Sequence, residues 1–174
     1  KMSALTNLPT NRNFLDPTKF RFAIKRAPSV QFFVQSINLP GFNIGPVSEG
    51  TPFVAIPFSG EHISYEPLQV TFMVDEDLQN YMEIYTWMRG LGFPDNFDQY
   101  KTLATQPKYT GTGVKSEVSL MILTSSNNPK YNVVFSDAFP TALTRIQFDA
   151  NATDIQYVTC TATFSYTSFE ILTT

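Results

Sequence analysis

The sequence predicts a mainly β protein of two packed antiparallel sheets, a sandwich or barrel, with one α-helix on its flank. Three observations support this prediction. Apolar and polar residues alternate in several short stretches that are separated by turn residues. Only residues 78–88 repeat their apolar side chains at helical spacing. Residues 154–171 alternate over a length roughly three times the usual strand of ~5–6 residues.

This last run has two chemically different faces, because successive side chains on a strand point to opposite sides. Cys160, the only cysteine, lies on the apolar face, where we expect it to be a small core residue. The other face carries small uncharged hydroxyl groups, namely Thr159, Thr161, Thr163 and Ser165. A strand of this length would reach beyond one compact domain, so we expect it to join a sheet shared between several copies.

The N-terminal half is predicted to contain an extended arm and three strands. Residues 1–18 lack alternation and predict an extended arm, which leaves 19–174 as a single domain. Strands are predicted over residues 19–25, 30–35 and 68–74. The polar faces of the second and third of these strands include Gln31, Gln35, Gln69 and Thr71.

Glycine and proline interrupt residues 41–60, which predicts a connecting segment with one extended piece over 53–58. Asp75, Glu76 and Asp77 precede the predicted helix, where negative charge suits the N-terminal dipole. An apolar stripe of Leu78, Tyr81, Met82, Tyr85 and Met88 is expected to face a sheet, with Ile84 and Trp87 widening it.

Residues 92–115 show neither period and are expected to form a long loop with a role in an interface. Strands over 117–124, 132–138 and 143–148 are then predicted before the final run.

The composition argues against catalysis. A single histidine, His62, and a single cysteine exclude a Ser-His-Asp triad and any Cys- or His-based metal site within one chain. We therefore expect no enzymatic activity, no metal and no cofactor. A net charge of −3 does not suit a surface that binds nucleic acid through clustered Lys and Arg. No apolar run is long enough to span a bilayer, and we expect synthesis in a reducing cytoplasm.

Aromatic residues are too numerous for a core of this size, and several fall in expected loops. Aromatic side chains are enriched in the buried centres of protein interfaces. We therefore expect contacts between subunits from Phe42, Phe53, Phe58, Phe93, Phe97 and Tyr100.

The order of elements resembles the tail tube proteins of contractile-tailed bacteriophages of the T-even type, which are similar to the inner tubes of type VI secretion machines. Residues 19–24 (KFRFAI) match the family pattern N-x-F-x-V-x-I, and residues 37–41 (INLPG) match its Leu-Pro turn. Residues 68–76 (LQVTFMVDE) resemble its W-x-V-T-V-x-x-D-E strand, and the helix that contains Trp87 follows. The likeness covers residues 13–91 and 116–171.

The resemblance implies stacked hexameric rings in the tail of a virion, assembled in the host cytoplasm, whose subunits jointly close a β-barrel around a lumen. The hydroxyl face of the final run would then line the lumen, together with the four residues of the earlier polar faces. The implied partners are other copies of the chain, the sheath, baseplate, tail-terminator and tape-measure proteins, and DNA passing without specific binding.

The arm and the long loop differ from shorter family members. The chain is thus either the main tube subunit or a special ring that starts or ends the tube at the baseplate or neck. A β-sandwich binding module of a baseplate or tail fibre is the third reading.

Overall fold

The computed structural model describes residues 13–50, 52–92, 97–105, 113–150 and 157–173. Two α-helices are present there, α1 (Gln79–Gly92) and α2 (Asp98–Ala104), with a 3₁₀ turn, η2 (Val30–Phe32). The strands are β1 (Phe20–Ile24), β2 (Val34–Ile37), β3 (Phe42–Ile44), β4 (Val47–Gly50), β5 (Ala55–Phe58), β6 (Ile63–Tyr65), β7 (Leu68–Met73), β8 (Ser116–Leu123), β9 (Pro129–Leu143), β10 (Thr159–Ser165) and β11 (Ser168–Thr173).

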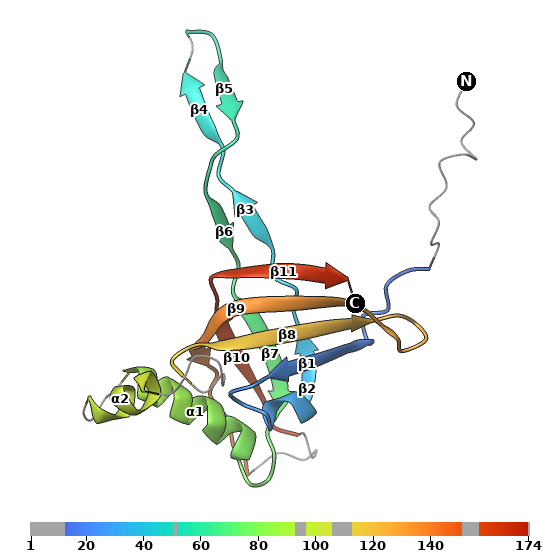
Figure 1. Ribbon diagram of the computed structural model, residues 1–174, viewed down its shortest axis with the longest axis vertical. Coiled ribbons are helices and arrows are strands. Elements are labelled where there is room, and N and C mark those ends of the chain that lie inside the picture. Colours follow the sequence, from blue (N-terminus) through green and yellow to red (C-terminus); the bar gives the residue numbers. More distant parts are fainter. Residues whose placement is uncertain (1–12, 51, 93–96, 106–112, 151–156, 174) are drawn as a thin grey trace.

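Strand β9 belongs to two sheets. Its first part pairs with β8 and β11, and β8 pairs in turn with β1; these four strands form the first sheet. Its last part pairs with β10, followed by β7 and β2, which form the second sheet. All pairs are antiparallel, so the predicted class of packed antiparallel sheets is confirmed (Figure 1).

The passage of β9 from one sheet to the other takes place at Asp137. This residue has φ 58°, a left-handed conformation that is uncommon outside glycine. Next to it, the pairing with β8 shifts register between Ser116 and Val118. Such a bulge bends a strand and increases its twist. Lys115 lies 3.5 Å from the Asp137 carboxylate across the bend.

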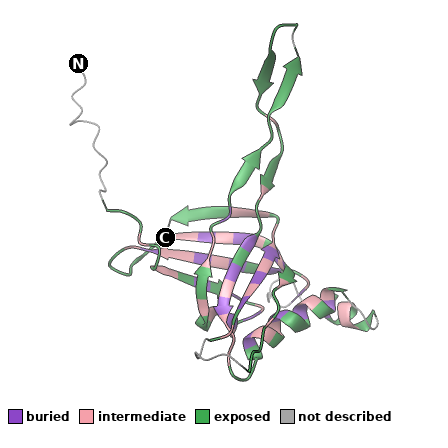
Figure 2. Ribbon diagram, turned by 180° about the vertical axis from the view of Figure 1, so that it is seen from behind, coloured by how far each residue is buried: buried purple, intermediate pink, exposed green. Residues whose placement is uncertain are grey.

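The core lies between the two sheets. Alternate residues of every long strand point inward, which gives the banded burial in Figure 2. Helix α1 packs at one end, where the Trp87 ring lies 6.2 Å from the Phe164 ring and its indole N–H donates to the Val114 carbonyl at 3.1 Å. The fully buried strand residues include Leu68, Val70, Phe72, Val118, Val133, Phe135, Cys160, Ala162 and Phe164.

Helix α1 forms where it was predicted, but it buries only one side of the predicted stripe, where Ile84 and Trp87 lie. The predicted stripe leaves Leu78, Met82 and Tyr85 exposed. The buried face consists of Asn80, Ile84, Trp87 and Gly90. Because apolar residues surround much of this helix, their spacing alone did not single out the face that Trp87 anchors.

Asn80 is buried without loss of hydrogen bonding, since its amide donates to the Met73 carbonyl at 2.7 Å. This bond ties the start of α1 to the end of β7. At the other end of α1, a Cβ on Gly90 would lie 2.5 Å from a methyl of Leu103 in α2. The two helices therefore pack closely, and the predicted structureless loop over 92–115 is wrong where α2 forms.

The predicted final strand is found from Thr159 onward, but a bend divides it. The alternation continues through two strands, β10 and β11, that are separated by Tyr166 and Thr167. β10 pairs with β7 and β9, whereas β11 pairs with the other part of β9. β10 and β11 run in the same direction along β9 and keep one register, with Ser165 opposite Phe139 and Ser168 opposite Ser136, so the chain only bends from one sheet to the other. The bend uses no glycine or proline, so the sequence carries no local signal for it. The remainder of the predicted run, residues 154–156, lies outside the described residues.

Three other predictions need correction. β9 extends the predicted strand 132–138 at both ends, to Pro129 and Leu143. Pro140 lies inside it beside a register shift between Thr163 and Phe164, where a missing N–H is tolerated. Residues 144–148 are not a strand. Strand β2 begins only at Val34, because residues 30–32 form the 3₁₀ turn.

Residues 41–60, expected to be a connection with one extended piece over 53–58, lie mostly in a long hairpin that spans residues 42–65. β3 pairs with β6, and further out β4 pairs with β5. Figure 1 shows this hairpin projecting from the sheets as a two-stranded ribbon. We refer to residues 42–65 as the projecting hairpin.

The bend at Asp137 gives a first prediction. Asp137→Val should lower the free energy of unfolding by about 1–2 kcal/mol, because a β-branched residue is strained in a left-handed conformation. Asp137→Gly is the matched control: it also loses the Lys115 ion pair but adopts this φ freely. Denaturant unfolding monitored by Trp87 fluorescence measures both variants. Equal stability of the two would contradict the proposed backbone constraint.

Candidate assembly surfaces

The polar face of the second sheet brings together most of the predicted lumen residues. Thr161 lies opposite Thr71, and their hydroxyl oxygens are 2.9 Å apart. Thr163 lies opposite Gln69 in the same pair of strands. With Thr159 and Ser165, these side chains form an uncharged surface that is partly exposed to solvent. We call this surface the threonine face.

Strand β2 extends this surface. Two predicted lumen residues, Gln35 and Gln31, do not lie at regularly paired strand positions. Ser36, which sequence reasoning missed, lies opposite Thr71. Gln35 falls at the register shift between Val34 and Ser36. Gln31 is not on a strand at all, because it lies in η2 and lines a groove beside β1. Its placement on a strand is therefore wrong.

The projecting hairpin is the most exposed apolar part of the described structure. Phe53 at its tip is 98% exposed, and Phe42 and Phe58 on its strands are 62% and 51% exposed. An isolated two-stranded hairpin is only marginally stable in water. Three predicted interface residues thus lie on an element that is exposed along its strands and at its tip.

Aromatic rings fix the base of this hairpin to the first sheet. The Tyr65 ring lies 5.8 Å from Tyr166 and 5.6 Å from Phe169, while Phe42 lies 6.3 Å from Phe169. The buried ring of Phe135 in β9 also packs on Tyr166, with the ring centroids 5.1 Å apart. Such pairs contribute roughly 0.5–1.5 kcal/mol each beyond burial. The hairpin therefore leaves the body in a defined direction, although its tip is unsupported.

The Tyr166 hydroxyl adds a polar contact to this cluster. It donates to the Glu66 carbonyl at 2.8 Å. Burial, with smaller repulsion from Tyr65 and Glu66, raises the pKa of Tyr166 to about 12. Sequence reasoning placed Tyr166 in a continuous strand and missed this role, because the signal lies in contacts between residues a hundred positions apart.

The remaining predicted interface residues lie around α2. Phe97 is the N-cap residue directly before α2 and is largely exposed. Its ring packs on Tyr100, with the ring centroids 5.5 Å apart. Phe93 lies outside the described residues. Figure 1 shows α2 at the end of α1, well away from the projecting hairpin, so the predicted set divides into two separate surfaces.

Acid–base or metal chemistry finds no support in the described part of the chain. No group of three His, Cys, Asp or Glu residues could hold a metal ion there. His62 is exposed on the projecting hairpin. Cys160 is buried, and desolvation raises the pKa of its thiol despite hydrogen bonds to Thr144. Among the described helices, none is long and apolar enough to cross a bilayer.

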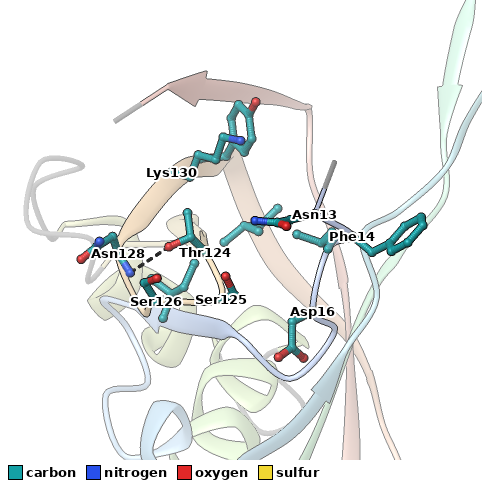
Figure 3. A pocket seen from close by; sticks show the side chains of 12 residues that line it. Asn13, Phe14, Asp16, Thr124, Ser125, Ser126, Asn128 and Lys130 are labelled. Atoms are coloured by element: carbon teal, nitrogen blue, oxygen red, sulfur yellow. Dashed lines mark hydrogen bonds between the residues drawn. The ribbon is translucent and has the colours of Figure 1, made fainter. Parts of the chain in front are cut away.

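A pocket of about 510 Å³ lies between the N-terminal residues 13–16 and the turn that joins β8 to β9 (Figure 3). Its one carboxylate, Asp16, accepts hydrogen bonds from the Thr18 backbone and hydroxyl at 3.0 and 2.7 Å, which lowers its pKa. Thr124 accepts from the Asn128 backbone N–H at 3.2 Å. These groups mainly satisfy local turns, and the arrangement offers no acid–base pair.

The sequence profile of the phage tail tube protein family matches residues 5–172. The chain belongs to the phage tail tube protein family. The chain is 30% identical over 173 residues to the tail tube terminator protein of Enterobacteria phage T4. This match covers 91% of this chain and 89% of the relative. The predicted tail tube resemblance is therefore confirmed.

Solved structures share the tail tube fold at low sequence identity. The cryo-EM structure of the anti-feeding prophage cap, the AFP tube terminating cap, matches with a TM-score of 0.64 and 13% identity, covering 99% of this chain and 100% of that one. The sheath–tube complex of the extracellular contractile injection system PVC matches with a TM-score of 0.57 and 11% identity, covering 94% of each chain. These likenesses show that the chain has the fold of tail tube proteins.

The hairpin base gives a second prediction. Because the folded protein raises the pKa of Tyr166 above its ordinary value of 10, Tyr166 stabilises the fold below about pH 10, and this contribution is lost as the pH rises towards 12. Spectrophotometric titration of the tyrosines, compared with Tyr166→Phe, should yield a difference curve with a midpoint near 12. A midpoint near 10 would show that Tyr166 is solvated and the cluster open.

Proposed function

We propose that this chain forms a closed ring that terminates the tail tube of a contractile phage or a related particle. The observation that carries the proposal is the match to a tube terminator protein over nine-tenths of both chains. The fold comparison supports it, since the AFP terminating cap is matched over its whole length. The ring is expected to contain six copies, to stack on the tube and to contact the sheath.

The threonine face lines the lumen of this ring. Its side chains carry hydroxyl and amide groups and no charge. The hydroxyl groups of Thr71 and Thr161 form a hydrogen bond with each other. Proteins gain affinity for DNA largely through Lys and Arg that displace counterions from phosphates. A neutral wall gives no such affinity, so DNA passes without being retained.

The fold itself favours assembly over a solitary existence. β1 and β2 are the outer strands of the two sheets, and no pairing joins them within the described residues, so the barrel stays open in one copy. Exposed strand edges invite pairing or cover by another chain. A ring supplies that cover six times with one repeated contact.

The main tube subunit is the second candidate function. The match to the PVC sheath–tube complex favours it. A tube subunit must offer stacking surfaces on both sides of the ring, which generates an open filament, whereas a terminator needs to stack on one side only. A β-sandwich binding module of a fibre has no comparable support from the family match.

Negative-stain electron microscopy of the purified protein distinguishes these candidates. At high protein concentration a terminator should give single or paired rings of constant height. Long tubes of variable length would instead identify the main tube subunit. Monomers or trimers at every concentration would contradict both readings.

The lumen assignment gives a third prediction. The double variant Thr161→Lys/Thr163→Lys should form rings that bind duplex DNA at low salt, with an affinity that falls steeply as salt is added. The matched control is Thr102→Lys/Thr105→Lys on the exposed side of α2, which adds the same charge outside the lumen. Fluorescence anisotropy of labelled DNA measures both. Equal binding by the two variants would contradict a lumen position for the threonine face.

A further inference from the structure

A groove of about 800 Å³ runs along the unpaired edge of β1, between that strand and the η2–β2 segment. Phe20, Phe22 and Val34 supply apolar walls, and Phe32 stands beside them with 77% of its surface exposed. Arg21 lines the same groove, is exposed and forms no ion pair within the described residues. The groove is thus apolar with a positive charge at its border.

The surroundings strengthen this positive character. Lys19 and Lys25 flank Arg21 along the strand, although Lys25 is already paired with Glu117 at 2.8 Å. In contrast, residues 27–88 contain no Lys or Arg at all. Positive charge is therefore concentrated beside the β1 edge and is absent from the projecting hairpin.

The projecting hairpin has the complementary composition. Its exposed apolar side chains include Val47, Ile56 and Phe58, and its only charged groups are Glu49 and Glu61. Neither carboxylate has an ion-pair partner in the part of the chain that the structure describes. An apolar ribbon with acidic side chains matches an apolar groove bordered by arginine.

The hairpin cannot reach the groove of its own chain. The aromatic cluster at its base directs it away from the body, and Figures 1 and 2 show it continuing beyond the ends of β2 and β7 and projecting away from the sheets. Residues 31–35, which line the groove, lie in η2 and the start of β2, and the hairpin leaves the chain only after the end of β2. At ~3.3 Å per residue, the ribbon from Phe42 to Gly50 extends roughly 25–30 Å into solvent. Its contact must come from another molecule.

We propose that the projecting hairpin of one copy docks into the β1–β2 groove of a second copy, with Arg21 facing the hairpin carboxylates. This rests on the proposed ring and names the contact that closes it. Hairpin and groove are different surfaces of the same chain, so the contact is head-to-tail and repeats around a ring until it closes. The docked hairpin covers the β1 edge and its own apolar strands at once.

A second apolar groove fits the hairpin less well. It lies between the segment that joins β7 to α1 and residues 146–148 and 157–158, and it has a volume of about 610 Å³. Phe33, Phe148 and Tyr157 line it. Asp75 and Glu76 also line it. An acidic hairpin would meet like charge there, which disfavours docking.

Charge reversal tests the proposal on the full-length protein. Arg21→Glu, and separately Glu49→Lys/Glu61→Lys, should each weaken ring formation at least about tenfold in sedimentation velocity. The triple variant carrying all three changes should recover much of the assembly, because the charges are again opposite. Arg145→Glu, an exposed arginine outside both surfaces, is the matched control and should assemble like wild type.

The outcomes separate this inference from the proposed function. If wild-type protein forms rings and both reversed variants form them equally well, the hairpin does not dock in this groove. If each reversal prevents assembly and the triple variant does not recover it, the two surfaces do not face each other. Wild-type protein that never forms a ring contradicts the proposed function instead. Circular dichroism confirms that each variant keeps its fold.

Discussion

The bend of β9 at Asp137 is the constraint on which the rest of the structure depends. One strand pairs first with β8 and β11 and then with β10, so it fixes how the two sheets face each other. The left-handed Asp137 allows this without breaking the chain of hydrogen-bonded strands. The apolar side of β10 then meets the core, and its hydroxyl side must point outward. The threonine face is a consequence of that single turn.

The same sheets leave two features of the structure uncovered in a single copy. The barrel has unjoined edges at β1 and β2, and the projecting hairpin extends apolar side chains into water. Both features are costly for a solitary molecule, yet both become ordinary buried surface when copies contact each other. Family membership and these exposed surfaces therefore support the proposed assembly independently, and the proposed contact between hairpin and groove follows from the charge pattern.

Much of the fold could be predicted from sequence because period-two alternation survives wherever one sheet face is buried. It correctly indicated β1, β7, β8 and the hydroxyl face of β10. It failed where no local signal exists: the bend at Tyr166 and Thr167 uses ordinary residues, and β9 continues through Pro140 beyond the end of the predicted strand 132–138. The aromatic base of the hairpin was out of reach, because it depends on the distant pairing of Tyr65 with Phe169.

Ring geometry is the most direct test of this account. A cryo-EM reconstruction of the purified assembly should show a closed ring in which Thr161 and Thr163 border the bore and each hairpin crosses to a neighbouring copy. A ring with the threonine face on its outer surface, or with all hairpins extended into solvent, would contradict the account.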